Sequence, residues 1–200
     1  MSEQFTLAGF DAPPPQPREP LTDRLFFALM PDPETAARIA HIAQQLRADH
    51  ALRGRLVLAE RLHVTLNHLG DFPAFPDELA DRAIKAAEAL PRVPAFDVSF
   101  DRAMSFSNRR ASNLPFVLRA NGGVDAMTAL AKALETVMIQ AGVMSKRATF
   151  TPHVTLLYDD RGVAEMPVEP VSWTAREFVL MHSLLGQTKH VMLARFPLAG

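Results

Sequence analysis

The chain has 200 residues, of which 48% are apolar and 22% are charged, and its formal net charge is −1. These are ordinary values for a globular protein, and the length allows a substantial core. A charge so close to zero argues against tight, non-specific binding to long nucleic acids. The chain contains no cysteine, which excludes disulfides, thiolate metal ligands and a cysteine nucleophile.

The sequence before the first predicted strand differs from the rest. Residues 1–22 include Pro13-Pro14-Pro15-Gln16-Pro17, which cannot be helical, so we expect a Pro-rich, disordered tail. Residues 23–200 then form a single domain. No apolar run approaches the ~20 residues of a membrane span, and no secretory signal is visible. We therefore expect a cytoplasmic protein that makes no use of a membrane.

The first half of the domain alternates strand and helix patterns. The apolar run from Leu25 to Met30 predicts a buried strand. Pro33 and Glu34 suit the first turn of a helix, whose apolar face is Ile39, Ile42, Ala43 and Leu46. The further elements predicted here are a short strand over 55–58, a strand over 62–69, a helix over 76–90 and strands over 95–106 and 115–119.

The second half begins with a turn at Asn121-Gly122-Gly123. A third helix follows and stops near Gly142. Four more strands are predicted over 150–158, 171–174, 177–185 and 190–196. This mixed order with short connections favours an α+β fold with antiparallel sheets over a doubly wound parallel sheet.

One tetrapeptide occurs twice in predicted strands. His63-Val64-Thr65-Leu66 returns, at an offset of 90 residues, as His153-Val154-Thr155-Leu156. Alternate side chains of a strand share a face, so each copy presents its His and its Thr on one face and buries its Val and Leu. If the two copies meet, two imidazoles and two hydroxyls share one site.

Such a site suits acid–base chemistry on a phosphate. One imidazole can take a proton from an attacking nucleophile while the other gives a proton to the leaving oxygen. Threonine hydroxyls can donate to the non-bridging oxygens. The alternative is that the two histidines are exposed on separate strands with no joint role. The spacing lacks a His-x-x-x-His motif or a carboxylate cluster, so we expect no metal and no cofactor.

The two motifs resemble the signatures of the two-histidine (2H) phosphoesterases. The first is 62–70, Leu-His-Val-Thr-Leu-Asn-His-Leu-Gly, and the second is 150–157, Phe-Thr-Pro-His-Val-Thr-Leu-Leu. The bacterial LigT-like RNA 2′,3′-cyclic phosphodiesterases, also called 2′-5′ RNA ligases, resemble this chain most, because its opening strand at 24–29 and its ending at 195–198 also match theirs.

The resemblance implies a bilobal α+β fold in which two antiparallel β-sheets line a central cleft, with helices on the outside. It implies that an RNA-terminal 2′,3′-cyclic phosphate is opened to a 2′-phosphate without metal. His63 would donate the proton to the leaving 3′ oxygen and His153 would activate water, while Thr65 and Thr155 hold the phosphate. The partners would be RNA 3′ ends or small cyclic nucleotides, and we expect a monomer.

The chain departs from the family at Tyr158, where many LigT-like members have an arginine five residues after the second histidine. A phenol brings no positive charge. Arg147 and Tyr158 are therefore added as candidate phosphate-binding residues, and the other cations considered are Lys146, Arg109 and Arg110.

For the remaining histidines and aromatic residues we expect structural roles. His68 lies five positions after His63, so strand parity predicts the opposite face. His182 and His190 are read as structural, although either could line the cleft. An aromatic side chain could stack on a terminal base, but Phe26, Phe106 and Phe116 are more typical of a core.

Three alternative functions stay open. The first is reversible 2′-5′ RNA ligation, and the second is cleavage of another cyclic or 2′-5′-linked nucleotide. The third is a non-catalytic module that binds RNA ends, which the missing arginine at Tyr158 keeps under consideration.

Overall fold

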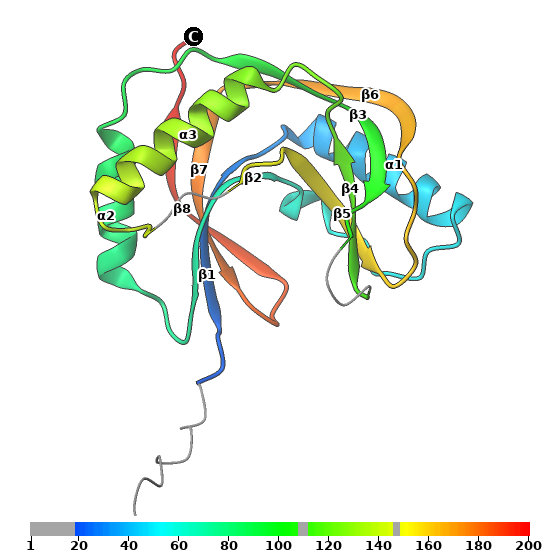
Figure 1. The fold of residues 1–200 in the computed structure, drawn as a ribbon, viewed down its shortest axis with the longest axis horizontal. Coiled ribbons are helices and arrows are strands. Elements are labelled where there is room, and N and C mark those ends of the chain that lie inside the picture. The colour runs from blue at the N-terminus through cyan, green and yellow to red at the C-terminus, as the bar shows by residue number, and fades with distance from the viewer. Residues whose placement is uncertain (1–18, 108–111, 146–148) are drawn as a thin grey trace, which may run out of the picture.

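The computed structural model describes residues 19–107, 112–145 and 149–200. The predicted tail therefore falls largely outside the described residues, as do Arg109, Arg110, Lys146 and Arg147. Figure 1 shows the described elements in chain order. They are β1 (Asp23–Leu29), α1 (Pro33–Asp49), β2 (Val64–Phe72), α2 (Asp77–Glu88), β3 (Phe96–Ser105), β4 (Leu114–Arg119), α3 (Asp125–Gln140), β5 (His153–Asp159), β6 (Met166–Ala175), β7 (Glu177–Leu184) and β8 (Lys189–Pro197).

The three helices were predicted correctly, and one predicted strand was wrong. Residues 55–58 contribute only an isolated bridge between Leu56 and Leu157, and a 3-10 turn (Ala59–Arg61) follows them. The segment runs beside β5 where β2 has already diverged from it, so it pairs at a single point. The predicted strand over 171–174 is the end of the longer β6.

All eight strands belong to one antiparallel sheet, in the order β6-β3-β4-β5-β2-β1-β7-β8. The expectation of two separate sheets was therefore wrong, although the sheet has two clear halves of four strands. The halves are joined by one residue pair, Val64 in β2 with Val154 in β5. In Figure 1 they diverge on either side of this junction.

Helices cover the two halves on the outside. Helix α1 packs against β5 and β6, whereas α3 packs against β2 and α2. Each of these helices follows a strand of one half and packs against the other half (Figure 1), so the connections tie the halves together. The Asp32 carboxylate caps α1 by accepting from the backbone N–H of Thr35 at 2.9 Å.

The main core runs continuously through both halves. In the β1 half, Phe27 is completely buried and packs against Phe178 and Phe196, with ring centroids 6.0 and 5.9 Å away. A second, smaller cluster comprises Phe26, Ala28, Val179 and Met181. It belongs to the opposite face of β1 and β7 because side chains alternate along a strand.

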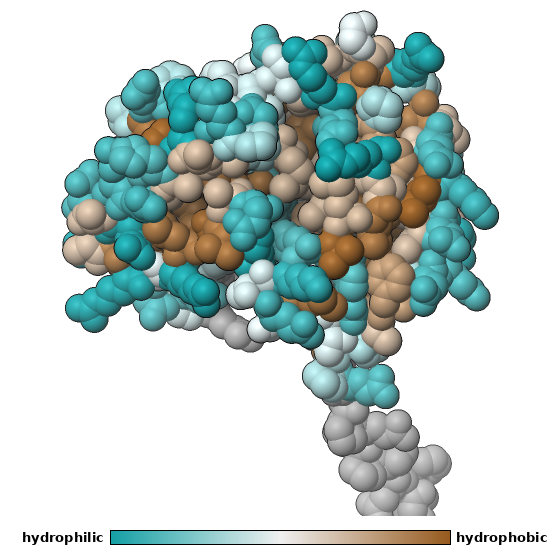
Figure 2. Space-filling model, turned by 180° about the vertical axis from the view of Figure 1, so that it is seen from behind, coloured by the Kyte–Doolittle hydropathy of each residue, from teal (hydrophilic) through white to brown (hydrophobic). Residues whose placement is uncertain are grey.

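Hydrophilic side chains surround the smaller apolar areas on the face seen in Figure 2. Among the described helices, none combines the length and the apolar character that crossing a bilayer requires.

Replacing Phe27 by Ala should lower the free energy of unfolding by about 3–5 kcal/mol, because the cavity left among three packed rings cannot close fully. Denaturant unfolding would measure this loss. The matched control is Leu21→Ala, since Leu21 is 52% exposed and its truncation should change the value by less than about 0.5 kcal/mol. Equal effects of the two substitutions would contradict this description of the core.

Candidate active site

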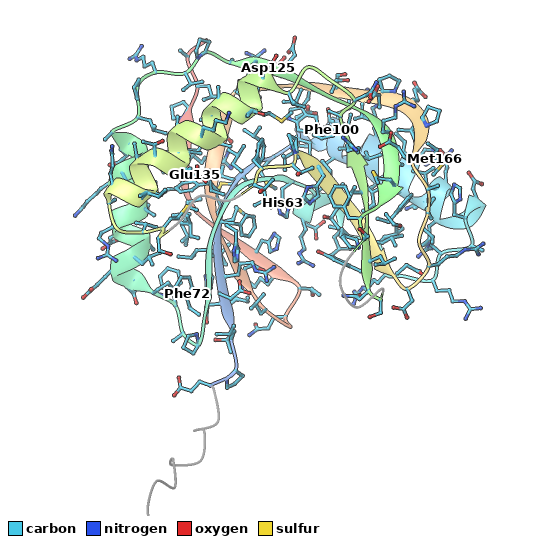
Figure 3. The ribbon with its side chains drawn as sticks, in the orientation of Figure 1. His63, Phe72, Phe100, Asp125, Glu135 and Met166 are labelled. Atoms are coloured by element: carbon cyan, nitrogen blue, oxygen red, sulfur yellow. The ribbon has the colours of Figure 1, made fainter. Side chains whose placement is uncertain are left out.

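The structure brings both repeated motifs to one cavity. His63, Thr65, His153 and Thr155 line a pocket of about 480 Å³ between the halves of the sheet. The valines and leucines of the motifs are at most 4% exposed and belong to the main core. The alternation of each motif thus separates a cavity face from a core face. Figure 3 shows His63 in the region between the β1–β2 half and the β4–β5 half.

The Val64–Val154 pair sets how the four side chains are arranged. In an antiparallel pair the flanking residues face each other in reverse order, so His63 lies across from Thr155 and Thr65 lies across from His153. The two imidazoles therefore occupy one diagonal and the two hydroxyls the other. Diagonal neighbours are roughly 7–8 Å apart. This spacing leaves room for one small anion between the two imidazoles.

Each motif ends in a β-bulge, at its leucine. Opposite β1, Thr65 pairs with Ala28 and Asn67 with Phe27, which leaves Leu66 as the extra residue. Opposite β4, Thr155 pairs with Val117 and Leu157 with Phe116, which leaves Leu156 extra. A bulge shifts the alternation of all later side chains by one position.

The bulges bring the fifth residue after each catalytic histidine candidate back to the cavity. His68 and Tyr158 both line it. The parity prediction for His68 was therefore wrong, because it assumed a regular strand. His68 is exposed and contacts the Asp71 carboxylate through Nε2 at 2.9 Å. Tyr158 is 48% exposed and stands at the equivalent position of the second motif.

Both imidazoles are held in the same way. His63 Nδ1 donates to the carbonyl oxygen of Arg61 at 2.7 Å, and His153 Nδ1 donates to that of Thr151, also at 2.7 Å. In each case the acceptor lies two residues earlier in the chain. A neutral ring held at Nδ1 keeps its lone pair on Nε2. Each ring is thereby prepared to exchange a proton through Nε2.

A phenylalanine packs against each of these rings. The centroid of Phe26 is 4.9 Å from that of His63, and the centroid of Phe106 is 5.0 Å from that of His153 in an edge-on contact. Phe26 is 3% exposed and Phe116 is completely buried. These two rings consequently have no free face on which a base could stack, and Phe26 instead supports the His63 ring.

Burial lowers the pKa of His63 from 6.5 to about 4. The nearby positive charges of Arg61 and Arg24 and the charge of His153 act in the same direction, whereas the hydrogen bond to the Arg61 carbonyl opposes them. The His63 ring is therefore expected to be neutral at pH 7.

Two further basic residues of the described chain line the cavity, Arg24 and Arg61. Arg24 forms a two-point ion pair with Asp71, at 2.6 Å from Nε and 2.8 Å from Nη2. Arg61 Nη2 instead lies 3.2 Å from Nε2 of His190. Sequence reasoning missed Arg61, because it lies in the 3-10 turn (Ala59–Arg61) before the motif, where strand alternation gives no signal.

The late histidines have different environments. His182 is buried, and its Nε2 lies 2.5 Å from the Asp23 carboxylate, which gives it the structural role that was expected. His190 lines the cavity, and its ring centroid is 5.6 Å from that of His63. Pairing of β7 with β8 brings His190 there, and only the tertiary structure reveals it. Among the described residues, no group of three or more His, Asp or Glu side chains has the arrangement of a metal site.

Comparisons with known proteins identify the relatives of this chain. The family model of the 2′-5′ RNA ligase superfamily matches residues 31–187. The RNA 2′,3′-cyclic phosphodiesterase of Escherichia coli strain K12 is 29% identical over 181 residues, which cover 88% of this chain and 96% of that protein.

Solved structures agree with the sequence relatives. A crystal structure of a phosphoesterase aligns with a TM-score of 0.71 at 27% identity, over 90% of this chain and 100% of that one. E. coli LigT complexed with 3′-AMP aligns with a TM-score of 0.70 at 27% identity, over 90% and 99% of the two chains. A protein of Thermus thermophilus at 22% identity shares the fold, with a TM-score of 0.69 over 88% and 98% of the two chains.

The depressed pKa of His63 makes stability depend on pH. Between pH 6.5 and about 4 the unfolded chain binds a proton at this ring and the folded chain does not. The free energy of unfolding should therefore fall as the pH is lowered through this window. His63→Gln should show a smaller decrease than the wild-type protein when both are unfolded by urea across this range. Parallel curves for the two proteins would contradict the assignment.

Proposed function

This chain belongs to the 2′-5′ RNA ligase superfamily as a LigT-like 2H phosphoesterase, and from that premise we propose that it hydrolyses RNA-terminal 2′,3′-cyclic phosphates to 2′-phosphates without a metal ion. The observation that carries the proposal is the diagonal arrangement of His63 and His153 across one cavity, each with Nδ1 bonded to a carbonyl oxygen.

The proposed reaction is a displacement at phosphorus. Nε2 of His153 takes a proton from water, whose oxygen forms the new bond to phosphorus. The bond to the 3′ oxygen breaks, and Nε2 of His63 gives that oxygen a proton. The product is a 2′-phosphate with a free 3′-hydroxyl, and solvent then returns the two rings to their starting protonation states. The assignment of donor and base follows the family resemblance, because the paired strands alone treat the two rings alike.

Thr65 and Thr155 occupy the other diagonal and would donate their hydroxyl protons to the two non-bridging oxygens. Negative charge grows on these oxygens as water attacks, so hydrogen bonds there are stronger in the transition state than in the ground state. The diagonal arrangement thus suits attack from one side and departure from the other.

The proposal requires that His63 gain a proton when substrate binds. Burial and neighbouring cations lower the pKa of the ring and so favour its neutral form. A cyclic phosphodiester carries one negative charge, which favours the imidazolium beside it and offsets the arginines. Substrate binding and protonation of His63 are therefore coupled in this mechanism.

We further propose that residues 23–200 act as one domain, in the cytoplasm and as a monomer, on RNA 3′ ends or small cyclic nucleotides. The absence of cysteine fits the cytoplasm. The proposal places all four motif side chains in the cavity of one chain, so no second copy is needed to complete the site.

A panel of RNAs and mononucleotides with cyclic phosphate ends would test the function. Hydrolysis gives a 2′-phosphate that chromatography separates from the 3′-phosphate standard. Ligation gives a longer product when an oligonucleotide with a 5′-hydroxyl is added, and cleavage of 2′-5′-linked dinucleotides would reveal the other esterase activity. Binding without any product after long incubation would identify an RNA-end binding module and reject the enzyme.

Replacing either His63 or His153 by Ala should lower the turnover of the cyclic phosphate by about 10²–10⁴-fold with EDTA present, because each ring moves one proton in the same transition state. The double variant should be little worse than either single variant. His41→Ala, on the exposed face of α1, is the control and should retain full activity. Wild-type turnover by either site variant would rule out this mechanism.

A further inference from the structure

The cavity needs a positive charge that the second motif does not supply. The substrate phosphate is an anion throughout the proposed reaction, and the family resemblance leads us to expect an arginine where this chain has Tyr158. The bulge at Leu156 turns position 158 toward the cavity, so an arginine there would reach the phosphate. The neutral phenol of Tyr158 leaves this role to another residue.

Arg24 is not available for this role. Both oxygens of the Asp71 carboxylate engage its guanidinium, and His68 contacts the same carboxylate at 2.9 Å. A two-point pair of this kind is the strongest geometry that arginine forms with a carboxylate, and it neutralises the charge. Arg24 thus contributes more to holding β1 against β2 than to attracting an anion.

Arg61 has a different set of contacts. Among the described residues no carboxylate lies within ion-pair distance of it. Its Nη2 donates to Nε2 of His190 at 3.2 Å, and its Nε is buried without a hydrogen-bond partner. The guanidinium also lines the same cavity as His63 and Thr155. Arg61 is partly buried, and a cation withdrawn from water without a counter-ion is stabilised when an anion binds beside it.

We propose that Arg61, oriented by His190, binds a non-bridging oxygen of the substrate phosphate and supplies the positive charge that Tyr158 lacks. The proposal deepens the proposed function and rests on it. Arg61 would touch the substrate, whereas His190 would act through Arg61 as a positioning residue.

His190 suits the positioning role. Its ring packs against Phe26 and His63, with both centroids 5.6 Å away, so it cannot turn freely. Burial lowers its pKa to about 4, and the charges of Arg61 and His63 add to the effect. The neutral ring can therefore accept from Arg61 at Nε2 under ordinary conditions.

Arg61 also links the phosphate to the acid–base machinery. Its carbonyl oxygen accepts from His63 Nδ1, while its guanidinium faces the cavity. The residue that fixes the His63 ring is thus the residue that would hold the phosphate. A guanidinium bound to a non-bridging oxygen would also stabilise the charge that develops there.

The decisive experiment removes the positive charge at position 61 and introduces one at position 158. Arg61→Ala should lower kcat/KM for a 2′,3′-cyclic phosphate by about 10²-fold or more. Adding Tyr158→Arg to that variant should restore at least tenfold, because position 158 opens into the same cavity. Arg53→Ala is the matched control, since Arg53 is exposed and lies outside the cavity.

The His190 variants separate positioning from packing. His190→Gln keeps an acceptor near the position of Nε2 and should stay within about threefold of wild type, whereas His190→Ala should lose about tenfold or more in kcat/KM. Equal losses in the two variants would reduce His190 to a packing residue and overturn that part of the proposal.

Calorimetric titration with inorganic phosphate gives a readout that does not need turnover. Arg61→Ala should weaken phosphate binding about tenfold or more, and Arg53→Ala should not. An inactive wild-type protein would reject the proposed function while this comparison still tested Arg61. Full activity and unchanged phosphate binding in Arg61→Ala, or no restoration by Tyr158→Arg, would overturn the assignment.

Discussion

The site depends on one backbone pairing, that of Val64 with Val154. Among the described strands, this pair joins β2 to β5 and so connects the two halves of the sheet, and it sets the register that puts the imidazoles on one diagonal and the hydroxyls on the other. Both valines are completely buried, so the junction belongs to the core rather than to a flexible hinge. A shift of one residue would turn every motif side chain to the other face. Packing around two valines therefore determines whether two distant histidines can act on one phosphorus atom.

Much of this arrangement could be predicted from the sequence, because it follows from local alternation. The His-x-Thr spacing on a strand correctly indicated which side chains face the cavity and which enter the core. The helices followed from apolar periodicity and, for α1, from Pro33 and Glu34 in the first turn. Alternation failed at the bulges, since an extra residue leaves no mark in the pattern, and His68 was consequently assigned to the wrong face. Pairing between distant strands was equally hidden, which is why the single sheet and the position of His190 had to come from the structure.

The surroundings of His63 favour its neutral form, whereas the proposed mechanism needs its protonated form. Phe26 and His190 pack around the ring, and burial together with the charges of Arg61 and Arg24 disfavours the imidazolium. Under the proposal, Arg61 attracts the phosphate that would reverse this preference. A site that is neutral at His63 until an anion arrives avoids holding two uncompensated charges, on Arg61 and His63, in one cavity. Under the proposed mechanism, binding of the substrate anion therefore favours the protonated form of His63, which then acts as the acid.

The two motifs are alike in backbone and unlike in environment. In each motif the histidine Nδ1 contacts the carbonyl oxygen two residues earlier, a phenylalanine packs against the imidazole, and a bulge occurs at the leucine. Beyond these features the first motif has Arg61, His190 and the Arg24–Asp71 pair, whereas the second presents Tyr158 to the cavity. A symmetric frame can place two rings about a phosphorus atom, but it cannot make one ring an acid and the other a base. Under the proposed mechanism, the unequal distribution of charge and burial around that frame would distinguish the two rings, and in this chain it is concentrated on the side of His63.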